Sequence, residues 1–205
     1  MRDGAEDDMN SQRSIRNYVL AATLLAVVAT ACNTEQDQAV KGRTGPNGPA
    51  RDTISDLALN EDGLGQIQIG MTLADAVNMG LLNERPDMKP ACDYVFPAVG
   101  AGIPFGVNVM VVKGKVARID VDTGTVTTED GAKIGDTEDR IKSIYGDEMK
   151  ITPDKYIPGG HTLTVMGDSA SASAGKALVF VTDGQRVTMF RAGRIPEVEW
   201  VEGCS

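Results

Sequence analysis

The sequence predicts an α+β fold in which two helix-plus-antiparallel-hairpin modules form one sheet. Three observations support this class: a short motif that occurs twice, a pair of β-prone runs after each copy, and alternating apolar and polar residues along those runs. Such alternation is typical of an antiparallel sheet that is buried on one face and wet on the other. We therefore expect one face covered by short helices and one face open.

The repeated motif is Ile-Gly-x-Thr. It occupies residues 69–72 and returns 65 residues later (134 − 69) at residues 134–137. In each copy the threonine, Thr72 or Thr137, suits a helix N-cap, because its hydroxyl can accept a hydrogen bond from a free N–H group of the first turn. A short helix is therefore expected after each copy.

Hairpins are predicted after both helices. In the first half the runs 105–112 and 115–122 flank a Lys-Gly turn, and in the second half the runs 177–182 and 186–191 flank an Asp-Gly-Gln turn. Glycine in such short connections is typical of hairpins. Two more runs with strand character are residues 161–166 and 197–202.

Alternation assigns the faces of the first hairpin. Ala117, Ile119 and Val121 should point toward the core, whereas Arg118 and Asp120 should point the other way. The two charged residues therefore belong to the predicted wet face.

Residues 1–31 are typical of a secretory signal peptide. Two arginines precede an uncharged run of 13 residues, Tyr18–Thr30, which is too short for a membrane-spanning helix of about 20 residues. An Ala-Thr-Ala cleavage pattern ends the segment at Ala31. Met9 is the more typical start, because four acidic residues lie before it.

Cleavage after Ala31 makes Cys32 the first mature residue. The stretch 28–32 resembles the lipobox of bacterial lipoproteins, in which the cysteine thiol receives diacylglycerol, although the usual leucine is here Ala29. Asn33 rather than an aspartate after the cysteine implies the outer membrane. We expect lipidation of Cys32, attachment to the membrane through this lipid, and a location in the cell envelope, periplasmic or surface-facing. Ordinary cleavage to a soluble periplasmic protein is the alternative.

Four segments follow from this reading. Residues 1–31 are the signal peptide, and residues 32–63 are the lipidated cysteine with a polar tether that lacks apolar periodicity and is expected to be disordered. Residues 64–130 and 131–205 are the first and second modules.

The cysteine count predicts a disulfide. Lipidation of Cys32 leaves Cys92 and Cys204, an even pair in an oxidising compartment. We expect a bridge between them that ties the end of the chain to its first half. Two buried free thiols are the alternative.

The composition excludes several functions. With 20 Lys plus Arg against 29 Asp plus Glu, a formal charge of −9, the chain is too acidic for nucleic acid. One histidine and three cysteines cannot form a His-rich or four-thiolate metal site. That histidine, His161, has no evident nucleophile or orienting acid, and residues 120–131 lack the spacing of a calcium loop. We expect no enzyme activity, no cofactor and no metal.

The layout also resembles a known group of proteins. A short helix entered by Ile-Gly-Met-Thr and followed by antiparallel strands is similar to the β-lactamase inhibitor protein and to the small lipoprotein of the outer-membrane barrel-assembly machine. The resemblance covers residues 64–205 and implies a non-enzymatic binding surface on the open sheet. The inhibitor has disulfides within each module, whereas Cys92 and Cys204 can bridge only between halves, which counts against β-lactamase inhibition. Residues 155–161 and 196–205 resemble uncharacterised xanthomonad-type lipoproteins, some labelled "lectin".

Two functions are therefore predicted. The first is a lipid-anchored, non-enzymatic binding module that acts through a protein partner; the alternative is a carbohydrate-binding, lectin-like protein whose partner is a glycan. Aromatic, arginine and histidine side chains are the candidates for binding, because tyrosine, tryptophan and arginine anchor interfaces. These candidates are Tyr156, His161, Arg191, Arg194 and Trp200. Trp200 exposed beside Tyr156 would favour the sugar, and Trp200 buried in the core would favour a protein partner.

Overall fold

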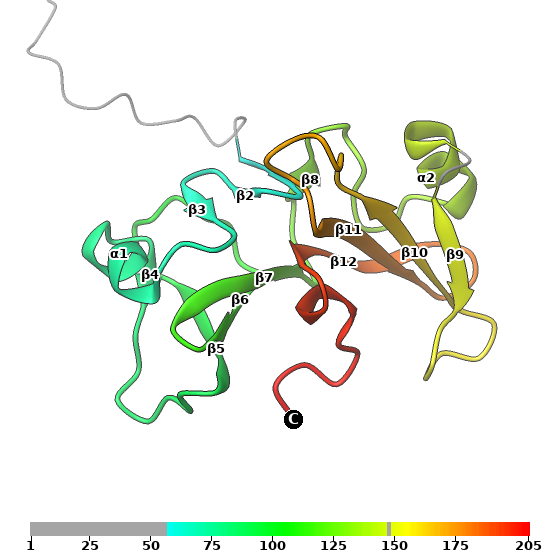
Figure 1. Cartoon of the computed structure of the whole chain (residues 1–205). Coiled ribbons are helices and arrows are strands. Elements are labelled where there is room, and N and C mark those ends of the chain that lie inside the picture. The colour runs from blue at the N-terminus through cyan, green and yellow to red at the C-terminus, as the bar shows by residue number, and fades with distance from the viewer. Residues whose placement is uncertain (1–56, 147–148) are drawn as a thin grey trace, which may run out of the picture. The chain divides into compact units, whose positions relative to one another are not determined.

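A computed structural model describes residues 57–146 and 149–205. The predicted signal peptide, Cys32 and most of the predicted tether lie outside these residues. Two sheets dominate the fold (Figure 1). The large sheet contains β4 (Leu82–Asn83), β5 (Cys92–Pro97), β6 (Val107–Val112), β7 (Lys115–Val121), β9 (Lys150–Pro153), β10 (His161–Met166), β11 (Lys176–Thr182) and β12 (Val187–Arg194). The small sheet contains β1 (Ala58–Asn60), β2 (Gly63–Leu64), β3 (Ile67–Gln68) and β8 (Thr127–Thr128).

Across the large sheet, the strands of the first half run in chain order and those of the second half in reverse chain order. The order is β4-β5-β6-β7-β12-β11-β10-β9, and every neighbouring pair is antiparallel. The last strand that each half contributes to the large sheet, β7 or β12, lies at the centre, and the two pair there. A single continuous sheet therefore contains strands from both halves.

The two copies of the motif make the same backbone contacts. Gly70 donates its N–H to the carbonyl of Val116 at 2.7 Å, and Gly135 donates to the carbonyl of Val187 at 2.8 Å. Val116 begins the apolar part of β7 as Val187 does in β12. These two valines therefore occupy equivalent positions of the two halves.

Both predicted N-caps are confirmed. Helix α1 (Leu73–Asn78) is capped by Thr72, whose Oγ1 accepts from the backbone N–H of Asp75 at 3.1 Å. Helix α2 (Glu138–Tyr145) is capped by Thr137, whose Oγ1 accepts from the N–H of Arg140 at 3.2 Å. Each helix thus begins where the motif ends.

The predicted α+β class is wrong, because the fold is mostly β. The two α-helices have six and eight residues and helix makes up only 12% of the structure. They do not cover a face of an eight-stranded sheet: α1 buries Leu73 and Ala76, and α2 buries only Ile141. Much of the covering layer consists of the small sheet and loops. Among the described residues, no helix combines the length and apolar character needed to cross a membrane.

The predicted tether also extends too far. Residues 57–63 contribute to the small sheet, where β1 pairs with β2 and with β8. Leu59 of β1 is fully buried in the main apolar core. Strands of two or three residues are too short to show alternation in a sequence, so this sheet was not predicted.

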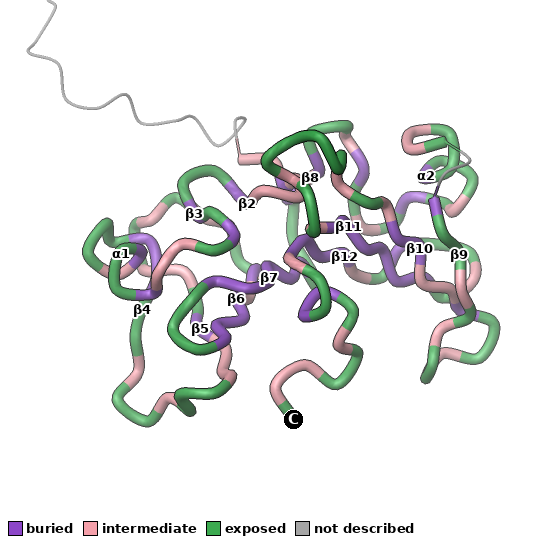
Figure 2. The backbone as a smooth tube through the Cα atoms, viewed as in Figure 1, coloured by how far each residue is buried: buried purple, intermediate pink, exposed green. Residues whose placement is uncertain are grey.

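The large sheet has two different faces. One face, here called the core face, packs Ile119, Phe180 and Phe190 against the small sheet and the helices. The other face, here called the second face, is crossed by the C-terminal segment, residues 195–205, which contacts β7, β11 and β12 through the 3₁₀-helix η2 (Glu197–Glu199). Figure 2 shows the most buried backbone in the central strands. The second face is therefore open only in part.

Two local predictions are wrong. The run 197–202 forms η2 and turns rather than a strand. Ala117 packs with Met110 under Trp200 rather than in the main core, because the register of β6 and β7 shifts between Met110 and Val111. A bulge of this kind places consecutive residues on the same side of a strand.

Candidate functional site

Three charged side chains lie at the centre of the second face. Arg118 and Asp120 come from β7 and Arg191 from β12, and their exposed fractions are only 3%, 4% and 4%. The β7–β12 register places Arg191 directly opposite Asp120. Ionised side chains are rarely buried so completely without partners. Their contacts therefore decide what the site can do.

Arg118 uses all three of its nitrogens on the protein. Its Nε donates to Asp120 Oδ2 at 3.0 Å, and its Nη1 donates to the backbone carbonyls of Glu197 at 3.0 Å and Trp200 at 2.7 Å. Its Nη2 donates to the hydroxyl of Tyr94. Arg118 therefore fixes the C-terminal segment to β7 and is a structural residue.

Arg191 is different. Its side chain makes no hydrogen bond or ion pair within residues 57–146 and 149–205, and its Nε is sealed from solvent without a partner. Burial lowers the pKa of Arg191, and the positive charge of Arg118 lowers it further. Burial likewise raises the pKa of Asp120, against the opposing effect of both arginines. A buried cation with unused donors is costly in a folded protein.

An open pocket of about 450 Å³, here called the central pocket, lies over these three charges. Its apolar walls come from Phe96, Met189 and Val201, and its polar rim from Asn108, Asp122 and Glu202. Asn108 Nδ2 donates to Asp122 Oδ2 at 2.9 Å. The pocket volume lies within the range of small-molecule sites.

A second pocket, here called the loop pocket, adjoins the central one. It has a volume of about 600 Å³, and Phe96, Asn108 and Asp122 line both. The loop between β5 and β6, residues 98–106 and here called the apolar loop, forms most of its wall. Phe105 is 88% exposed and Val99 is fully exposed on this loop.

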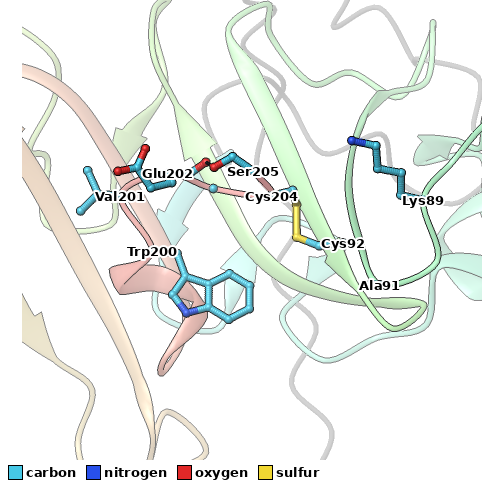
Figure 3. A pocket seen from close by; sticks show the side chains of 9 residues that line it. Lys89, Ala91, Cys92, Trp200, Val201, Glu202, Cys204 and Ser205 are labelled. Atoms are coloured by element: carbon cyan, nitrogen blue, oxygen red, sulfur yellow. Dashed lines mark hydrogen bonds between the residues drawn. A yellow bond between two sulfur atoms is a disulfide. The ribbon is translucent and has the colours of Figure 1, made fainter.

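A third pocket, of about 520 Å³, lies at the disulfide. The predicted bridge between Cys92 and Cys204 is confirmed, and it joins β5 to the C-terminal segment. Figure 3 shows the disulfide between Trp200 and the loop that carries Lys89. Trp200 is half-buried and packs against the cluster of Met110 and Ala117. It therefore supports the C-terminal segment rather than presenting a free ring.

The structure brings few of the candidate binding residues together. Arg191 lines the central pocket and Trp200 the pocket at the disulfide. Arg194 donates from Nη2 to Glu197 Oε1 at 2.6 Å, which anchors the start of η2. Tyr156 is 57% exposed on the turn between β9 and β10, with Lys155 Nζ 4.9 Å from its ring centre. Tyr156 and Trp200 share none of these three pockets.

The side chain of His161 contacts Glu138 and lines none of these three pockets. Its Nδ1 lies 2.8 Å from Glu138 Oε1, and Thr182 Oγ1 donates to the same oxygen at 2.5 Å. Burial alone would raise the pKa of Glu138, but the hydrogen bonds from Thr182 and His161 outweigh it and leave the pKa lowered. The histidine therefore links β10 to α2. In the part of the chain that the structure describes, no cluster of three or more possible metal ligands is found.

Several residues of the site escaped prediction. Tyr94 and Phe96 lie on β5, a strand that the sequence did not indicate. Arg118 and Asp120 were assigned to the correct face by alternation, but the cover from the C-terminal segment was not foreseen. The position of Tyr94 leaves room only for a glycine at residue 203, because a Cβ atom on that residue would lie 2.7 Å from the tyrosine hydroxyl.

No protein-family model, curated protein or solved structure matches this chain.

Proposed function

We propose that this protein is a lipid-anchored, non-enzymatic binding module of the bacterial cell envelope that binds a protein partner through the apolar loop. The observation that carries the proposal is the exposure of Phe105 and Val99 beside the loop pocket. The anchor at Cys32 and the envelope location rest on the predicted signal peptide and on the resemblance of residues 28–32 to a lipobox. They place the domain where an envelope protein can reach it.

Large apolar side chains at the rim of a pocket favour a protein interface. Phe96 on β5 is 49% exposed, and it extends the apolar surface of Phe105 and Val99 toward the second face of the sheet. Aromatic anchors that fill pockets supply much of the free energy of protein association, and contiguous apolar patches mark interaction sites. The loop pocket offers the complementary cavity for one side chain of the partner.

Charge defines the partner further. The chain carries a formal charge of −9, and Asp122 lies at the boundary of the loop pocket. A partner with apolar side chains surrounded by lysine and arginine would be electrostatically complementary, which increases association rates and excludes acidic competitors. We therefore propose a basic protein surface as the binding partner.

The absence of a catalytic role is supported by the placement of the imidazole. The imidazole of His161 contacts Glu138 through Nδ1, and it is the backbone N–H of His161 that donates to the hydroxyl of Thr182. General-base catalysis needs the base within hydrogen-bond reach of the proton it removes.

Photo-crosslinking in native membranes tests the proposal. A photoreactive residue is placed at position 105 of the full chain, and a matched probe is placed at Tyr156, another exposed aromatic residue. We expect one saturable crosslink to a basic protein from position 105 only, reduced at least tenfold in crosslinking yield by Val99→Ser. Equal labelling from both positions, or a yield unaffected by Val99→Ser, would contradict the proposal. A crosslink to a second copy of the same chain would also contradict it.

A further inference from the structure

Arg191 is the least satisfied buried group of the second face. It is 4% exposed, lines the central pocket and has no hydrogen-bond partner among the described residues. Arg118, 3% exposed on the neighbouring strand, donates from all of its nitrogens. The unused donors of Arg191 therefore need an explanation that packing does not provide.

Stability does not supply that explanation. A buried charge is often replaced by an apolar side chain of similar volume without loss of stability, because desolvation offsets the attraction to its neighbours. Nε is the only nitrogen of Arg191 that is sealed without a partner. The terminal Nη nitrogens are thus the donors that the side chain presents to the central pocket.

The other charges of the central pocket restrict the ligand. Asp120 lies beneath it, and Asp122 and Glu202 lie at its rim. Arg118 pairs with Asp120, and Lys155 Nζ lies 2.7 Å from Glu202 Oε1, so among the described residues Arg191 and Asp122 remain as one charge of each sign without an ion pair. A neutral hydroxyl is both donor and acceptor, so adjacent hydroxyls can accept from Arg191 and donate to Asp122 at the same time.

The walls favour a ligand that also has an apolar side. Phe96, Met189 and Val201 border the central pocket, and 450 Å³ leaves room for a ring compound of modest size. The C–H face of a sugar ring packs well against such side chains, while its hydroxyls reach the polar groups.

We propose that the central pocket binds a neutral sugar, with its hydroxyl groups bonded to Arg191 and Asp122. The central pocket shares Phe96 and Asp122 with the loop pocket, but Arg191 lines only the central pocket, so Arg191 variants test the sugar separately from the protein partner. The residues also differ from Tyr156 and Trp200, which the sequence suggested for a sugar.

Calorimetric titration of the full chain with methyl glycosides tests the proposal. The panel contains neutral hexoses and N-acetylhexosamines, with a uronic acid and an amino sugar as charged analogues. We expect saturable binding of at least one neutral sugar, with both charged analogues at least fivefold weaker. Immobilised glycans that end in the same sugar form a second arm. Binding of either form supports the proposal, and a preference for one identifies the free sugar or the envelope glycan as the source.

Variants connect that binding to the central pocket. Arg191→Met and Asp122→Asn should each weaken binding at least tenfold, whereas Arg186→Met, an exposed arginine at the start of the same hairpin strand, should leave it unchanged. Asp122 is exposed, so Asp122→Asn folds even if Arg191→Met does not. The proposal is overturned if no neutral sugar binds, if the uronic acid binds most tightly, or if Asp122→Asn binds as the unaltered protein does. Phe105→Ser should not affect sugar binding, so failure of one proposal leaves the other testable.

Discussion

The two halves of the large sheet place a loop at the same position and use it differently. The apolar loop between β5 and β6 exposes Phe105 and Val99. The corresponding loop between β10 and β11, residues 167–175, is polar and is attached to the small sheet, because Asp62 accepts hydrogen bonds from Ser173 at 2.9 Å and from Lys176 at 2.6 Å. One loop supports the fold, and the other is left available for contact.

The two halves also differ in the charge that they place at the centre of the large sheet. Since Val116 and Val187 are equivalent, Asp120 of β7 corresponds to Arg191 of β12, and the two face each other across the ladder. Identical charges at these positions would repel, since like charges directly opposite one another destabilise a sheet. The two halves thus place opposite charges at their junction.

The largest effect is expected at Arg118, whose counterpart in the second half is Met189. Arg118→Met makes the two halves alike, but it leaves Asp120 less compensated and two carbonyls of the C-terminal segment without donors. We expect a loss of about 3–5 kcal/mol in the free energy of unfolding, measured by urea denaturation. Met189→Leu is the control, with a loss below about 1.5 kcal/mol. A loss under 1 kcal/mol at Arg118 would contradict the role given to it.

A smaller effect, with a pH signature, is expected at the first residue of α2. Glu138 accepts hydrogen bonds from Thr182 and His161, whereas its counterpart in α1 is the buried Leu73. The pKa of Glu138 is lowered in the folded state, so its contribution is present above the unfolded pKa of about 4.3 and is lost as pH falls through the folded value. Glu138→Gln should cost about 1–2 kcal/mol at neutral pH and little below pH ~3.5.

The control for this prediction is Leu73→Ala. It removes apolar burial, so it should cost about 2–4 kcal/mol with the same value at both pH values. A cost of Glu138→Gln that does not change between neutral and acidic pH would show that the carboxylate is not ionised in these bonds.

The two N-caps should give equal effects. Thr72→Ala and Thr137→Ala each remove a side-chain acceptor at the start of a helix, and each should cost about 1 kcal/mol. Thr72→Ser and Thr137→Ser, which keep the hydroxyl, should restore most of the loss. Costs that differ by more than about twofold would mean that the halves are not equivalent at this motif.

The smallest effects separate the two loops. Lys176→Met removes the hydrogen bond that lowers the pKa of Asp62, and we expect it to cost below about 1 kcal/mol because the pair is partly exposed. Phe105→Ser should change the free energy of unfolding by less than about 0.5 kcal/mol, because the side chain is 88% exposed. If Phe105→Ser lowers the free energy of unfolding more than Lys176→Met does, the apolar loop stabilises the fold and is not free to bind a partner.

How much the sequence predicted depended on the distance between interacting residues. The caps at Thr72 and Thr137 and the hairpins were predicted because their signals are local. The small sheet was missed because its strands are too short to show a period, and β5 because its run from Cys92 to Pro97 contains no such alternation. The alternating residues 197–202 look like a strand, but bonds from Arg118, distant in sequence, hold them in another conformation.

The site shows the same limit. Arg191 was a candidate because arginine commonly anchors interfaces, but its burial beside Asp120 could not be predicted before the β7–β12 pairing was known. Trp200 and Tyr156 were grouped by residue type alone, and the topology separates them.

The mirrored strand order also determines how the protein can associate. Because β7 and β12 pair at the centre, the two edges of the large sheet are β4 and β9, which have only two and four residues. Strand β9 begins with Lys150 and ends with Pro153, and both charge and proline at an edge oppose the addition of another strand. The sheet is therefore protected against edge-to-edge polymerisation. Recognition is left to its loops and to the second face.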